Sequence, residues 1–93
     1  MIVGVLRTDL RLGGPRSLKD KRRIIQSLLD RVHRQFRMAA AEVDYQESWR
    51  RSALGFACVS SEAEHASRML SRVVGLIERE TEVDLVDYAI EML

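Results

Sequence analysis

The segment SLKDKRRIIQSLLDRVHRQFR, residues 17–37, decides the fold of this chain. Its apolar side chains recur at intervals of three and four residues, which places them on one face of an α-helix. They are Leu18, Ile25, Leu28, Leu29, Val32 and Phe36. Ser17 is a favourable N-cap residue, and Asp20 follows at the acidic position of a capping box. The segment predicts a helix whose apolar face, with Leu28 and Phe36, is buried and whose opposite face is strongly basic.

Four segments around this helix have the patterns of β-strands. Residues 1–12, 38–46 and 83–92 alternate between two faces, and residues 53–59 form the near-continuous apolar run of a central strand. Ser61 and Glu64 match a capping box, so a second helix is expected to begin there. The order is β-α-β-β-α-β. With right-handed crossovers it predicts an α+β, ferredoxin-like fold, a four-stranded antiparallel sheet of order 4-1-3-2 with two helices on one face.

Length and composition fit one globular domain over residues 1–93, since 46% of the residues are hydrophobic and 31% are charged. No apolar run approaches the roughly 18 residues of a membrane span, and the N-terminal MIVGVLR does not resemble a signal peptide. Cys58 is the only cysteine, which excludes an internal disulfide and fits a reducing compartment. We therefore expect a cytoplasmic protein that does not associate with membranes.

The formal net charge of +1 conceals an uneven distribution of charge along the chain. Residues 1–38 hold ten Lys and Arg against three Asp and Glu, a net charge of +7. Residues 39–93 hold five against eleven, a net charge of −6. This imbalance indicates either a basic surface for an anionic partner or two halves that neutralise each other in the folded protein. Both interpretations are open at this level.

The basic residues predict a surface that contacts nucleic-acid phosphates, which gives affinity without sequence specificity. The candidates lie just before the first helix, on it, and in the turn ahead of the third strand. They are Arg16, Lys19, Lys21, Arg22, Arg23, Arg34, Arg37, Trp49, Arg50 and Arg51. The alternative is a solvated helix face, with Trp49 as a lid over the edge of the core. Base stacking on the sheet, as in RNA recognition motifs, is not expected, because the first strand has no aromatic residue.

Three motifs show that the chain resembles the small bacterial YlxP-like proteins, a family of unknown function. The motifs are SLKDKRR, the run FRMAAAE that ends at Glu42, and the segment from Gln46 to Trp49 ahead of an apolar strand. The resemblance implies a ferredoxin-like fold. It also implies a role near RNA or ribosome maturation, since family genes lie beside those for transcription elongation, translation initiation and ribosome-binding factor A. Ala39 and Ala40 stand where relatives tend to have serine, which argues against a hydroxyl-dependent role there.

The sequence predicts no enzyme active site, no cofactor and no metal site. His33, His65 and Cys58 lack the spacing of metal ligands, and neither histidine has a nucleophile beside it. Glu42 and Asp44 lie two residues apart on one predicted strand face, where solvated carboxylates are commoner than an acid–base pair.

The loop formed by Gly13, Gly14, Pro15 and Arg16 stands where acylphosphatases, which share this fold, would hold a phosphate. Those enzymes also need an asparagine to position the attacking water, and this chain contains none. The loop is therefore expected either to bind an anion without catalysis or to be a plain strand-to-helix turn.

Two functions of different classes are consistent with these features. The first is a non-catalytic accessory protein that docks on RNA or a ribosomal particle through the basic helix face. The second is a dimeric protein–protein or small-ligand-binding regulatory module that binds no nucleic acid.

A homodimer is expected in either case, joined through the sheet face that carries no helix. Alternation directs Val86 and Tyr88 to the helices and leaves small aliphatic side chains on the other face, a patch that is uncommon on a monomer. The candidate interface residues are Val3, Val5, Ala53, Ala57, Val59 and Leu85.

Overall fold

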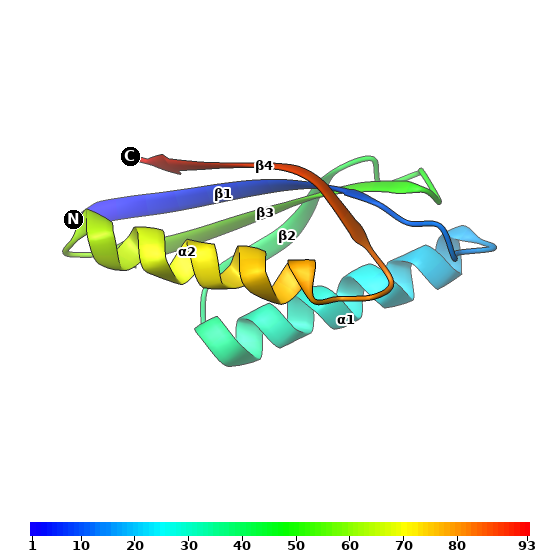
Figure 1. Ribbon diagram of the computed structural model, residues 1–93, viewed down its shortest axis with the longest axis horizontal. Helices are drawn as coiled ribbons and strands as arrows, with labels where there is room; N and C mark the ends of the chain where they lie inside the picture. The colour runs from blue at the N-terminus through cyan, green and yellow to red at the C-terminus, as the bar shows by residue number, and fades with distance from the viewer.

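Six elements follow one another in the predicted order in the computed structural model, which describes residues 1–93 (Figure 1). They are β1 (Ile2–Arg11), α1 (Leu18–Phe36), β2 (Ala39–Asp44), β3 (Arg51–Ser60), α2 (Ala63–Glu78) and β4 (Asp84–Met92). The strands form one antiparallel sheet of order β2-β3-β1-β4, and both helices cover the same face of it (Figure 1). This confirms the predicted α+β, ferredoxin-like fold and its strand order.

The two ends of the sheet differ in what they carry (Figure 1). The chain termini lie together at one end, where Val3 and Leu93 exchange two backbone hydrogen bonds. The β1–α1 loop and the β2–β3 hairpin lie at the opposite end, beside the first turn of α1 (Figure 1). Segments that are about 30 residues apart in the sequence therefore meet at this second end.

The core lies between the helices and the covered face of the sheet. Leu6 of β1 and Phe56 of β3 are cross-strand partners, and both are buried. Leu28 of α1 has no exposed surface, as predicted. Phe36 was expected to be buried as well, but it is only partly so, because it is the last residue of α1 and packs against the edge of the core.

Helix α2 approaches β1 closely at Gly4. A Cβ atom at this position would lie 3.0 Å from Cδ1 of Leu70 and 3.2 Å from Cβ of Ala66. Interiors are packed too densely to accept such contacts without displacement of the neighbours. The missing side chain of Gly4 therefore sets how closely α2 can lie on the sheet.

The two helices begin differently. Ser17 is the N-cap of α1, and its hydroxyl accepts a hydrogen bond from the backbone N–H of Asp20 at 3.0 Å, as predicted. The capping box expected at Ser61 does not form, since α2 begins at Ala63 with no side-chain cap. Ser60 accepts from the backbone N–H of Glu62 instead, so the turn after β3 is closed before the helix starts.

A β-bulge in β4 changes part of the predicted face assignment. Asp87 pairs with Asp9 and Leu85 pairs with Leu10, which leaves Val86 as the extra residue. Leu85 consequently packs against the core, whereas Val86 is 54% exposed. The sequence pattern had predicted the reverse, with Val86 towards the helices and Leu85 on the helix-free face. The prediction was wrong because it continued the strict two-residue alternation through the bulge.

We expect Leu28→Ala to lower the free energy of unfolding by roughly 2–5 kcal/mol, because it removes a fully buried side chain and leaves a cavity. Arg34→Ala, on the exposed face of the same helix, is the matched control and should cost well under about 1 kcal/mol. Urea denaturation of the two variants measures the difference. A larger loss for Arg34→Ala would contradict the observed orientation of α1.

Candidate nucleic-acid interface

Lys21 was predicted to contact a nucleic acid, but its side chain is completely buried. Nζ lies 2.7 Å from Oε2 of Glu42 and donates to the carbonyl oxygen of Tyr45 at 2.8 Å. The hydroxyl of Ser52 donates to the same oxygen of Glu42. The predicted role was wrong, because Lys21 stands four residues before Ile25 and therefore on the apolar face of α1. That position was the signal, visible in the sequence, that its charge needs a partner inside the protein.

The partner of Lys21 lies on the regular part of β2, and a bulge after it turns the next carboxylate away. Glu42 pairs with the buried Leu54 and so faces the helices by ordinary alternation, where it binds Lys21. Asp44 pairs with Ala53, so Val43 is the extra residue and Asp44 lies on the helix-free face, where Nη2 of Arg7 lies 3.4 Å from its Oδ2. The two carboxylates had been expected on one face. A bulge is not visible in the sequence pattern, so this separation could not be predicted.

Lys21 also holds the β2–β3 hairpin against the start of α1. Its acceptor, Tyr45, has a left-handed backbone with a φ of 60°, which is uncommon for a residue other than glycine. Two further bonds join the hairpin to the β1–α1 loop. Nη1 of Arg50 donates to the carbonyl of Gly13 at 3.0 Å, and the N–H of Leu12 donates to the carbonyl of Arg50 at 2.9 Å. The hairpin and the helix therefore form one continuous surface.

Five of the predicted residues on the joined loop, helix start and hairpin have exposed side chains, and we call them the basic end. They are Arg16, Lys19, Arg22, Trp49 and Arg50. None of its four cations has a carboxylate oxygen within 4.0 Å, which distinguishes them from the paired cations elsewhere. Trp49 is 46% exposed and does not pack against the core, so it is not a lid.

The remaining candidates are not part of the basic end. Arg23 lies 3.5 Å from a carboxylate oxygen of Asp20. Arg51 stacks on the ring of Tyr45, with its guanidinium carbon 4.2 Å from the ring centroid. Arg34 and Arg37 lie at the other end of α1, about 20 Å along the helix axis from Arg22. The predicted set therefore divides into one cluster and several separate residues.

Part of the basic charge is neutralised within the fold. Three of the six ion pairs join residues 1–38 to residues 39–93: Arg7 with Asp44, Lys21 with Glu42, and Arg31 with Glu80. The hydrogen bond from Arg31 lowers the pKa of the Glu80 carboxyl. The hydrogen bond to Asp9 raises the pKa of the Arg7 guanidinium. The two parts of the chain thus neutralise each other only partly. The cations of the basic end remain without a carboxylate partner.

Other chemistry-bearing residues form no cluster. No three side chains of the types His, Cys, Asp and Glu are placed to hold a metal ion, and neither helix combines the length and apolar character of a membrane span. Nε2 of His33 lies 3.3 Å from the carbonyl of Ala40, and Cys58 packs against the core.

The loop before α1 has acidic surroundings. The hollow beside it is lined by Asp20, Glu82 and Asp84 as well as by Gly13 and Gly14. An anion placed there would face three carboxylates and a single guanidinium, that of Arg23. The surroundings therefore favour the interpretation of this loop as a plain turn.

The helix-free face of the sheet carries an apolar hollow of about 570 Å³. Its walls include Val5, Ala39, Ala41 and Ala57, and Gly55 forms part of its floor. A Cβ atom at Gly55 would lie 2.9 Å from Cγ1 of Val43, so only glycine lets the bulged β2 lie this close.

The candidate interface residues are distributed differently from the prediction. Val3, Val5 and Ala57 are partly buried on the helix-free face, and Val59 there is 67% exposed. Ala53 is on this face but has no exposed surface. Its strand partners are Asp9 and Asp44, and Arg7 forms an ion pair with each of these two carboxylates. Leu85 packs on the opposite side of the sheet, as described above.

Comparison with known proteins gives a family without an assigned activity. The family described as "Protein of unknown function (DUF503)" matches residues 3–90. The uncharacterized protein YlxP of Bacillus subtilis (strain 168) is 35% identical over 68 residues, which are 73% of this chain and 74% of that protein.

Among solved structures, the de novo designed protein Foldit4 matches with a TM-score of 0.54 and 13% identity, over 98% of this chain and 96% of that chain. This likeness shows the fold alone. The cofactor-independent oxygenase SnoaB from Streptomyces nogalater reaches a TM-score of 0.49 at 9% identity, over 99% of this chain and 90% of that chain. A likeness of that strength says nothing about the chemistry of this chain.

We expect Glu42→Ala to lower the free energy of unfolding by about 3–5 kcal/mol, because it leaves the buried ammonium of Lys21 without its carboxylate. Glu47→Ala, an exposed acid in the same hairpin, is the matched control and should stay within about 0.5 kcal/mol of the parent. Lys21→Met combined with Glu42→Leu should cost less than Glu42→Ala alone, because no unpaired charge remains buried. Chemical denaturation measures the free energy of unfolding of all three variants. A double variant that is less stable than Glu42→Ala would contradict this account.

Proposed function

We propose that this chain, which belongs to the DUF503 family of proteins of unknown function, docks on RNA through the basic end. The resemblance to the YlxP-like proteins predicted this family. Because the family has no assigned function, the proposal rests on the surface of the protein. The observation that carries the proposal is the cluster of unpaired cations beside an exposed tryptophan. Arg16, Lys19 and Arg22 come from the start of α1, and Trp49 and Arg50 come from the hairpin bound to it.

Phosphate binding is the chemistry that suits this cluster. Arginine binds phosphate oxygens in a bidentate manner and lysine binds them as a point charge. Each contact releases counterions from the nucleic acid, which favours binding and makes it depend on salt. Cations already paired with carboxylates contribute less, so the unpaired state of the basic end supports a role in binding.

Trp49 favours single-stranded RNA over a continuous duplex. An exposed aromatic ring beside phosphate-binding arginines is the arrangement on which unpaired bases stack, at about 1–3 kcal/mol per base. The helix-free face of the sheet does not offer such a platform, since Arg7 lies across it in an ion pair with Asp9 and Asp44. The proposed contact therefore lies at the end of the fold and not on the sheet.

The function that we propose is that of an accessory factor and not of a catalyst. Its basic end contains no nucleophile, no general base and no pair of carboxylates, so it supports binding without bond cleavage. A ribosomal particle is the proposed location of the RNA. This part of the proposal is supported by the gene neighbours that the YlxP-like resemblance implies.

Replacing Arg16, Lys19 and Arg22 together with Ala should flatten the salt dependence of RNA binding. The slope of log affinity against log salt should fall by about 2 if each residue contacts one phosphate of a single strand. The melting temperature should change little, since all three side chains are exposed and unpaired. Fluorescence anisotropy with a labelled single-stranded RNA measures the slope.

Two further variants make this test specific. Arg68→Ala, an exposed arginine of α2 that lies 4.0 Å from Glu64, is the matched control and should leave the slope unchanged. Trp49→Ala should weaken binding at every salt concentration without a change of slope, and Trp49→Phe should restore part of the affinity. A parent protein with no RNA affinity at low salt would rule out this function.

We propose as a second function that the helix-free face of the sheet binds a second copy of the chain. The apolar hollow lined by Val5 and Ala57 supports this, since small aliphatic side chains allow two flat sheets to approach closely. Four strands of this length cover roughly 550 Å². Two copies would bury about 1,100 Å², near the lower limit for a specific interface, so the dimer should be weak and depend on concentration.

Light scattering over a range of protein concentrations should therefore show the mean mass rising from one chain towards two. Val5→Glu combined with Ala57→Glu should keep the protein monomeric, because these cross-strand partners would place two charges in the interface. Glu47→Gln, on the hairpin surface, is the control and should dimerise as the parent does. A parent that remains one chain at every concentration would exclude the dimer.

A further inference from the structure

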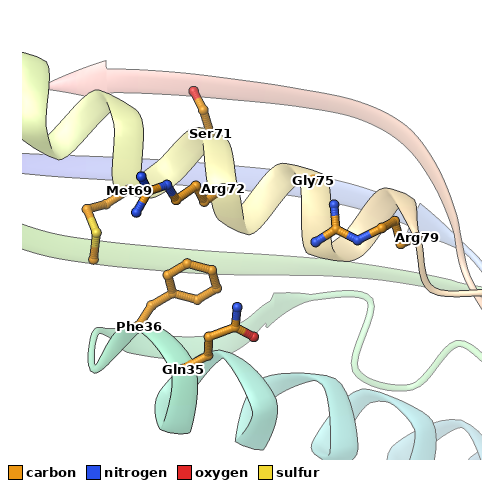
Figure 2. A pocket seen from close by; sticks show the side chains of 7 residues that line it. All are labelled: Gln35, Phe36, Met69, Ser71, Arg72, Gly75 and Arg79. Atoms are coloured by element: carbon orange, nitrogen blue, oxygen red, sulfur yellow. The ribbon is translucent and has the colours of Figure 1, made fainter.

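A groove between the end of α1 and the middle of α2 combines two arginines with an apolar wall (Figure 2). The groove encloses about 570 Å³. Arg72 and Arg79 come from α2 or its C-cap, and they stand two helical turns apart on one side of that helix, about 10 Å apart along its axis. Phe36 of α1 and Met69 of α2 form the apolar wall beside Arg72 (Figure 2).

Both guanidinium groups lack a carboxylate partner. The two ion pairs that involve α2 or the turn after it join Arg68 to Glu64 and Arg31 to Glu80. Glu80 is the acid that follows Arg79 directly in the sequence, and its bond with Arg31 lowers the pKa of its carboxyl. The nearest acid in the sequence is thus occupied, and the positive charge of Arg79 remains available to a ligand.

Gly75 gives Arg79 its place in the groove. Figure 2 shows the guanidinium of Arg79 turned back along α2 towards Gly75. A Cβ atom at Gly75 would lie 3.3 Å from Nη1 of Arg79 and would meet no other atom within 4 Å. Glycine is unfavourable inside a helix, and the core does not require it here. The guanidinium of Arg79 is therefore the side-chain group that lies in the space beside Gly75.

We propose that this groove binds a nucleotide, with its phosphates on Arg72 and Arg79 and its base against Phe36 and Met69. Guanidinium groups recognise phosphate through paired hydrogen bonds, and two of them along one line suit a chain of phosphates. An apolar wall with a partly exposed aromatic ring suits the planar face of a base. Gln35, whose amide points towards α2 in Figure 2, supplies a donor and an acceptor for the polar edge of that base.

A free small molecule and a residue of an RNA chain are two sources of the nucleotide, and the chemistry of recognition is the same for both. The groove does not depend on the basic end. The two sites are about 20 Å apart along α1, since the basic end uses its first turns and the groove uses its last. Each site can therefore be removed without disturbance of the other.

Isothermal titration with ADP, pyrophosphate and adenosine tests the proposal. ADP should bind more tightly than either of the other two, which present only its phosphates or only its base. Arg72→Ala and Arg79→Ala should each lower the affinity for ADP by about tenfold or more, as expected for the loss of a charge-assisted hydrogen bond. Arg68→Ala, the neighbouring arginine that does not line the groove, should leave the affinity for ADP unchanged.

Gly75→Ala separates a binding role from a structural one. Alanine favours the helix, so this variant should raise the melting temperature. It should also weaken the binding of ADP, because the new methyl group would lie 3.3 Å from Nη1 of Arg79 and require this atom to shift by a few tenths of an ångström. A variant that gains stability and keeps its full affinity would overturn the role of Gly75.

Parallel measurements with a short single-stranded RNA identify the source of the nucleotide. Binding of ADP that survives in the Arg16, Lys19 and Arg22 triple variant would establish a site for a free nucleotide, whatever the result for RNA docking. Loss of RNA affinity in Arg72→Ala and Arg79→Ala, without any binding of ADP, would identify a nucleotide of an RNA chain. If these two variants change neither affinity, the proposal is wrong.

Discussion

The buried ion pair between Lys21 and Glu42 is the interaction on which the arrangement of this surface depends. The ammonium of Lys21 has no exposed surface and the carboxylate of Glu42 is only 16% exposed, so these charges are tolerated only because they are paired, and the carbonyl of Tyr45 and the hydroxyl of Ser52 complete the set. One partner comes from α1 and the others from β2, the hairpin and β3. The pair therefore does more than offset its own desolvation, because it fixes the hairpin against the start of the helix. Two of the three motifs that carry the YlxP-like resemblance contribute one charge each, so this part of the resemblance has a structural explanation.

Backbone irregularities decide what each face of the sheet presents. The bulge at Val43 sends Asp44 to the helix-free face, and the bulge at Val86 sends Leu85 into the core. Gly55 then lets Val43 lie over β3, which shapes the apolar hollow on the helix-free face. A regular β2 would have kept Asp44 on the same face as Glu42. These irregularities thus determine the surface that a second copy would contact.

The charge distribution along the chain has a similar division of roles. Three ion pairs between the two parts of the chain neutralise Arg7, Lys21 and Arg31. Some of the unpaired cations lie at the basic end and others line the groove between the helices. Both places lie away from the apolar hollow of the sheet. The two phosphate sites and the dimer face that we propose therefore use different elements of the fold.

The sequence by itself determined the element order, the strand order and the apolar face of α1, because side-chain periodicity reports directly on burial within one helix or strand. It also contained the position of Lys21 on that apolar face, although not the identity of its partner. Tertiary structure alone decided that Glu42 is this partner, because the two residues lie on different elements. The structure alone also decided that Asp44 leaves the face of Glu42 and that Leu85 faces the core, because a single extra residue in a strand reverses its alternation without changing its composition. It also decided which arginines are unpaired and that Arg72 and Arg79 face Phe36 across a groove. Such contacts join residues far apart in the sequence, and no local pattern specifies them.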